Sequence, residues 1–158
     1  MTRRSLENRI QKKPDQTALL VSPDERDHEV LGSLFREQRW YLHTATSLSA
    51  AFAMLQEESV GLIITERDFP LGDWKSVLEG VHVLRETPLL IVISRLADEY
   101  LWSEALNLGA HDVLVKPLDR TEAVRVISSA WRHCPKPRVA DFKAQLAPSL
   151  KAANSAAY

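Results

Sequence analysis

The sequence is poor in residues that several classes of protein require. Its 158 residues include one cysteine, Cys134, which excludes a disulfide framework and a zinc site built on several thiolates. Only five glycines are present, and they form no glycine-rich phosphate-binding loop. No apolar run approaches the roughly 20 residues that a membrane-spanning helix needs, and the first residues are too polar for a signal peptide. We therefore expect a soluble, cytoplasmic protein that does not enter membranes.

Charge is distributed unevenly along the chain. Residues 1–16 and residues 134–158 each carry a net charge of +3, whereas residues 17–133 carry −7. This pattern predicts a basic N-terminal extension (1–16), one folded domain (17–133) and an Ala/Pro-rich C-terminal tail (134–158). An acidic domain is not typical of nucleic-acid binding, so we expect no nucleic-acid partner. The two basic ends either contact a polyanion or the acidic domain, or are simply solvated termini.

Short apolar runs alternate with segments of helical periodicity in the folded domain. The runs predict five buried strands: Thr17–Val21, Trp40–Thr44, Gly61–Thr65, Leu89–Ile93 and Asp112–Val115. Five apolar stripes at helical spacing lie between and after them: Val30/Leu31/Leu34/Phe35, Leu48/Ala51/Phe52/Leu55, Trp74/Val77/Leu78/Val81/Leu84, Leu101/Ala105/Leu108 and Ala123/Ile127/Ala130/Trp131. This alternation predicts an α/β fold with a parallel sheet between two layers of helices.

In such a sheet, functional groups gather where the strands end. The residues that follow the predicted strands are Ser22, Pro23 and Asp24 after the first, Glu66 after the third, Ser94 after the fourth, and Lys116 and Pro117 after the fifth. We therefore expect these side chains to share one edge of the sheet.

These positions carry a family resemblance. The segment Gly109–Pro117 resembles the G-A-x-D-Y-L-x-K-P segment of response regulator receiver domains. Ser94 with Asp98 resembles the family's hydroxyl and following acid, and the stretch from Glu66 to Asp73 resembles its phosphoacceptor loop. The resemblance covers residues 17 to about 133. It implies a flavodoxin-like, doubly wound sheet of five strands in the order 2-1-3-4-5 with five helices, and a signalling module rather than an enzyme.

The resemblance also implies a phosphorylation site, from which this sequence departs. Family members phosphorylate an aspartate with the help of Mg²⁺ held by an acid pair, but Ser22 and Pro23 stand at the acid-pair positions. Asp24 corresponds to a position outside the metal shell. Glu66 stands at the phosphoacceptor position and is one methylene longer than aspartate, which misplaces its oxygen for attack. We therefore expect no phosphotransfer, no Mg²⁺ and no other cofactor.

The retained residues allow two interpretations. Without a metal, Lys116 is expected to pair directly with Glu66. That pair is either an internal ion pair or an imitation of the charge of an acyl phosphate. Ser94 and Val113 correspond to the family's switch residues, and Val113 lacks the aromatic ring that usually turns. The five histidines show no metal-ligand spacing, so no metal site is predicted.

Trp102, Leu106 and Val113 predict an interface, most simply a two-fold dimer contact on the side of the fourth helix, fifth strand and fifth helix. The sequence thus favours a stand-alone, degenerate (pseudo-receiver) module of bacterial two-component or phosphorelay signalling. Its protein partners would be a histidine kinase or an output protein, besides a second copy. A receiver that still accepts phosphate at an altered site is the first alternative. A small α/β enzyme or ligand-binding domain is the second.

Overall fold

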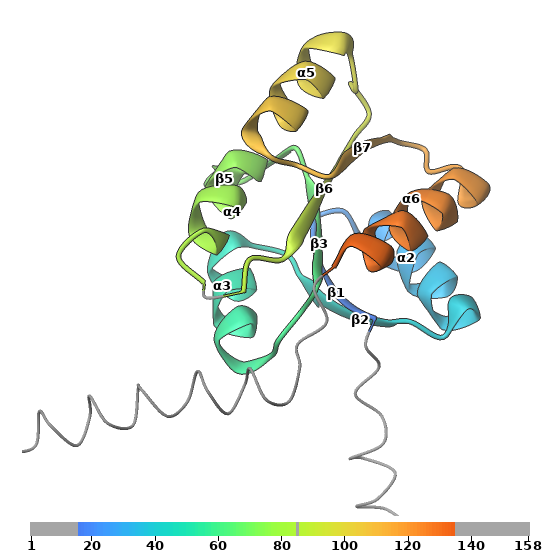
Figure 1. Cartoon of the computed structure of the whole chain (residues 1–158), viewed down its shortest axis with the longest axis horizontal. Helices are drawn as coiled ribbons and strands as arrows, with labels where there is room; N and C mark the ends of the chain where they lie inside the picture. Colours follow the sequence, from blue (N-terminus) through green and yellow to red (C-terminus); the bar gives the residue numbers. More distant parts are fainter. Residues whose placement is uncertain (1–15, 85, 135–158) are drawn as a thin grey trace, which may run out of the picture.

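A five-stranded parallel sheet forms the centre of the molecule (Figure 1). The structure is a computed structural model, and it describes residues 16–84 and 86–134. The strands are β1 (Thr17–Val21), β2 (Tyr41–Ala45), β3 (Leu62–Glu66), β6 (Leu89–Ser94) and β7 (Asp112–Val115). Their order, β2-β1-β3-β6-β7, is the predicted order 2-1-3-4-5. Most of the predicted basic extension and Ala/Pro-rich tail lies outside the described residues.

Helices cover both faces of this sheet, and the described residues contain five of them (Figure 1). The helices α3 (Leu48–Glu57), α4 (Trp74–Val81) and α5 (Glu99–Leu108) pack on one face through one apolar cluster. The helices α2 (Glu25–Gln38) and α6 (Arg120–His133) pack on the other face through a second cluster. Within the described residues, no helix has the length and apolarity needed to cross a bilayer.

Local signals in the sequence explain where the helices begin and end. Each of the five helices starts after a side chain that accepts a hydrogen bond from a backbone N–H of the first turn: Asp24, Ser47, Asp73, Asp98 and Asp119. Gly109 ends α5 in the left-handed conformation, with φ of 105°, which glycine adopts without strain. The Lys116–Pro117 peptide bond is cis.

The structure differs from the predicted elements in several places. Strand β2 begins one residue later than predicted, because Arg39 adopts a left-handed conformation and the Trp40 N–H bonds to the Phe35 carbonyl, 2.9 Å away. A two-stranded hairpin, β4 (Asp68–Phe69) with β5 (Gly72–Asp73), was not predicted. Val30 is 47% exposed and does not belong to the buried stripe of α2. Leu108 is likewise half-exposed.

Candidate functional site

The ends of four strands bring the predicted polar residues to one edge of the sheet. Ser22 follows β1, Glu66 ends β3, Ser94 ends β6 and Lys116 follows β7. The backbone ladder continues past the strands, because the Lys116 N–H donates to the Ser94 carbonyl at 2.9 Å. The sheet itself therefore fixes the relative positions of these residues.

Lys116 is the centre of the site. Its ammonium contacts the Glu66 carboxylate, as the sequence predicted. It also donates a hydrogen bond of 2.9 Å to Asp27 Oδ2, and Asp24 Oδ2 lies 4.0 Å away. Only 9% of the Lys116 side chain is exposed to solvent. One buried ammonium is thus shared by at least two carboxylates.

Asp27 is the functional residue that the sequence reasoning missed. It lies in the first turn of α2, is buried, and accepts hydrogen bonds from both Ser22 Oγ (2.7 Å) and Lys116. The sequence did contain a signal. Asp27, Leu31 and Leu34 follow the i, i+4, i+7 spacing of the buried face of α2, and an acid on an apolar face needs a partner.

Ser22 and Asp24 organise the connection between β1 and α2. Ser22 is fully buried; its hydroxyl donates to Asp27 and accepts from the Asp24 N–H at 3.1 Å. Asp24 accepts from the Arg26 N–H at the helix start, and its other oxygen lies 3.7 Å from the Arg95 guanidinium. Pro23 between them is exposed. A second carboxylate, that of Asp27, therefore reaches Lys116 from α2, beside the Glu66 carboxylate from the end of β3.

Burial shapes the titration of the central pair. Burial raises the pKa of the Glu66 carboxyl above its usual range and outweighs the opposing effect of the Lys116 ammonium. Burial lowers the pKa of Lys116, but hydrogen bonds to Glu66 and Asp27 outweigh it, so the pKa of the ammonium is raised. Lys116 therefore carries its charge at neutral pH.

Ser94 lies at the predicted edge but does not join the network around Lys116. Its hydroxyl accepts a hydrogen bond from the Leu96 N–H at 3.1 Å, within its own loop. The side chain is buried, and the described residues show no hydrogen bond between Ser94 and Glu66.

The comparisons with known proteins agree with this geometry. Residues 18–128 match the model of the response regulator receiver domain. The chain belongs to the response regulator receiver domain family. The receiver domain of an HD domain-containing protein from Pseudomonas fluorescens Pf-5 is 26% identical, with a TM-score of 0.68 over 75% of this chain and 88% of that chain. The chemotaxis response regulator CheY4 of Vibrio cholerae, at 16% identity and a TM-score of 0.66 over 73% of this chain and 98% of that one, shares the fold.

Two relatives in sequence are matched over only part of their own length. The two-component response regulator-like protein APRR3 of Arabidopsis thaliana is 25% identical over 121 residues, which are 73% of this chain and 24% of the plant protein. The chemotaxis protein CheY of Treponema pallidum is 33% identical over 73 residues, 46% of this chain and 51% of that protein. The chain spans less than a quarter of the plant relative and about half of the chemotaxis protein.

The Mg²⁺ ion of the family scheme does not fit the donors in this receiver. Ser22 stands where a ligating acid is required, and its hydroxyl already donates to Asp27. The Lys116 ammonium already contacts Glu66 and Asp27, so a second cation among these oxygens would be repelled. Among residues 16–84 and 86–134, no three His, Cys, Asp or Glu side chains are placed to hold a metal ion.

Not all of the residues predicted to form an interface lie at the surface. Leu106 is 48% exposed on α5, and Trp102, one turn before it, packs partly against the core. Val113 is 1% exposed and belongs to the core beneath α5, so its assignment to the interface was wrong. Strand β7 is covered by helices on both faces, and this buries Val113 as well as Leu114.

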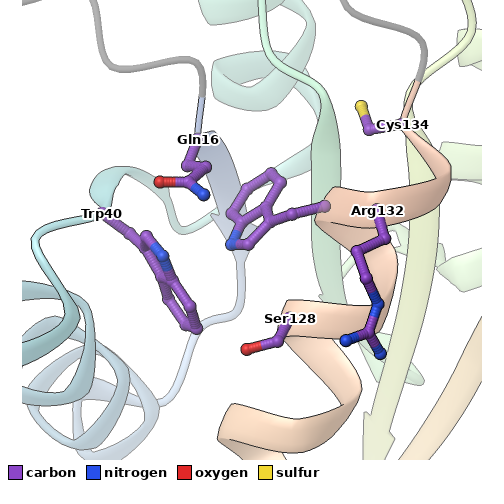
Figure 2. A pocket seen from close by; sticks show the side chains of 6 residues that line it. Gln16, Trp40, Ser128, Arg132 and Cys134 are labelled. Atoms are coloured by element: carbon purple, nitrogen blue, oxygen red, sulfur yellow. The ribbon is translucent and has the colours of Figure 1, made fainter.

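A hollow of about 530 Å³ lies at the opposite end of the sheet, where the strands begin (Figure 2). It is lined by Gln16, Trp40, Ser128, Trp131, Arg132 and Cys134. The Cys134 thiol donates to the Gly61 carbonyl at 3.1 Å, and burial raises its pKa. Cys134 is thus a structural thiol rather than a reactive one.

Proposed function

We propose that this receiver is a protein-interaction module whose signalling does not depend on phosphorylation of Glu66. The carrying observation is the closed network in which Lys116 bridges Glu66 and Asp27. In the family scheme the equivalent lysine binds the incoming phosphoryl oxygens. Here a second carboxylate holds the lysine, and the phosphoryl group would have to displace it.

Three further observations support this proposal. Glu66 extends one methylene beyond an aspartate, and a misplacement of about 1 Å alone lowers a rate by about 100-fold. The donor set does not suit Mg²⁺. Without the metal ion, phosphoryl transfer loses several kcal/mol of charge stabilisation in its transition state. Ser94 bonds within its own loop, and Val113, at the switch position, is a buried side chain without an aromatic ring.

The test is exposure of the chain to acetyl phosphate with Mg²⁺, followed by intact-mass measurement under mild conditions. A receiver with the full acid pair serves as the positive control, and the Glu66→Ala variant as the matched negative one. We expect no species heavier by one phosphoryl group. An adduct that forms on the native chain and is absent from Glu66→Ala would instead support the alternative, a receiver that accepts phosphate at an altered site.

The exposed side of α5 is the proposed contact surface. It presents Leu106 with the partly buried Trp102 beside it, and a two-fold contact between copies would bring these residues together. Other partners would be a histidine kinase or an output protein of a bacterial-type two-component pathway. We place this module in the cytoplasm, where such partners are found.

A further inference from the structure

Two histidines that are far apart in the sequence meet at the end of the sheet where the strands begin. His111 immediately precedes β7, and its backbone N–H donates to the Leu90 carbonyl at 2.7 Å. His133 is the last residue of α6, which runs back along the sheet to the same end (Figure 1). The two imidazole centroids are 5.7 Å apart and the rings are tilted by 46°. The pocket around Lys116 lies at the other end of the strands.

The hydrogen bonding of His133 fixes which nitrogen is available. Its Nδ1 lies 2.8 Å from the Ser129 carbonyl oxygen. A carbonyl only accepts, so Nδ1 carries the proton and the neutral ring presents the lone pair of Nε2. This is the arrangement that orients metal-binding histidines in proteins, where the second ring nitrogen commonly donates to a backbone carbonyl.

His111 is also suited to act as a ligand. Its ring is half-buried, and the described residues offer it no hydrogen bond. The Asp112 carboxylate accepts from the Val113 N–H through Oδ1, and the Cys134 thiol is engaged with Gly61.

We propose that His111 and His133 form a two-histidine binding site for one divalent transition-metal ion. Metal–nitrogen bonds of about 2.0–2.1 Å place two imidazole centroids on one ion about 4.5–6.4 Å apart, and the observed separation falls in this range. Imidazole pairs favour Cu²⁺, Ni²⁺ and Zn²⁺ over Mg²⁺. No third His, Cys, Asp or Glu among the described residues joins the pair, so water fills the other coordination positions.

The site would connect α6 to the start of β7, so metal binding should stabilise the fold. The experiment titrates a tag-free chain with Ni²⁺, Cu²⁺ or Zn²⁺ by calorimetry at pH 7.5 and follows the unfolding midpoint. We expect one ion per chain, affinity in the order Cu²⁺ above Ni²⁺ and Zn²⁺, and no response to Mg²⁺ at the same concentration.

Substitutions separate this site from adventitious binding. His111→Ala and His133→Ala should each weaken binding at least about tenfold, and the double variant little more than either, because the two rings share one ion. His82→Ala, at an exposed position after α4, is the matched control and should bind as the native chain does. Circular dichroism establishes that each variant is folded.

Two results would overturn the proposal. The first is a native chain that binds none of the three ions below about 1 mM. The second is a pair of folded variants, His111→Ala and His133→Ala, that bind as tightly as the native chain. Neither result bears on phosphorylation at Glu66, which is measured separately at the opposite end of the sheet.

Discussion

Replacing Lys116 by methionine is the sharpest test of the network at the strand ends. Methionine keeps an unbranched apolar chain of similar length and removes only the charge and the donors. The change leaves Glu66 and Asp27 facing each other without a cation, although Asp27 is buried and the Glu66 side chain is only 15% exposed. Breaking a buried ion pair in this way typically destabilises a protein by about 3–5 kcal/mol.

Protonation of a carboxyl group limits how much unfolding free energy the variant can lose through electrostatic repulsion. The variant can relieve the repulsion by protonating Glu66, whose ordinary pKa is 4.5. Holding that proton at pH 7 costs about 3.4 kcal/mol, and at pH 5 about 0.7 kcal/mol, since each pH unit corresponds to about 1.4 kcal/mol. A raised pKa in the folded variant means that the folded state binds the proton more tightly. The deficit in unfolding free energy should therefore shrink as the pH falls toward 4.5.

The assay is urea unfolding followed by tryptophan fluorescence at pH 7 and pH 5. We expect Lys116→Met to lose about 3 kcal/mol at pH 7 and about 1 kcal/mol or less at pH 5. Lys75→Met is the control, because Lys75 forms an exposed ion pair with Glu104 and should change stability little at either pH. Adding Glu66→Gln to Lys116→Met should recover part of the loss. The reasoning would be refuted if Lys116→Met lost less than about 1 kcal/mol of unfolding free energy at pH 7, or if the loss were the same at pH 7 and pH 5.

The remaining predictions concern the contact surface and the metal of the family scheme. Leu106→Glu should abolish self-association, measured by sedimentation at about 100 µM chain. Leu108→Glu is the control and should leave self-association unchanged, because Leu108 is 46% exposed on the other side of the same helix. A monomeric native chain, or equal effects of both substitutions, would contradict the proposed dimer. Millimolar Mg²⁺ should produce no saturable change in tryptophan fluorescence, because Lys116 occupies the place of a cation beside Glu66 and Asp27. A binding curve that disappears in Asp27→Asn would count against that reading.

The fold was largely predictable because its signals are local. Short apolar runs identified all five strands of the sheet, and β1 and β7 have the predicted bounds. In the structure, Asp98, Asp119 and Gly109 fix the ends of α5 and α6 through interactions within a few residues. The hairpin β4–β5 was missed because its strands are two residues each, too short for any alternation to show.

The site was predictable only as far as the strand ends define it. The contact between Glu66 and Lys116 followed from parallel strands ending at one edge. Asp27 was missed because its partner Lys116 lies 89 residues away, and helical periodicity alone does not say what a buried acid faces. Val113 was misplaced although two layers of helices were predicted, because a side chain on a strand that is covered on both faces packs in the core whichever face it points to.

The ion pair between Lys116 and Asp27 also affects how quickly the molecule unfolds. It joins the start of α2 to the loop after β7 across 89 residues, so most of the chain must be ordered before it can form. Contacts of such long range close late, after the loop entropy between them has been overcome. Interactions absent from the folding transition state act mainly on the unfolding rate. The ion pair of this receiver would then form after the folding transition state. It would lower the unfolding rate, so that the folded state lasts longer, and leave the folding rate nearly unchanged.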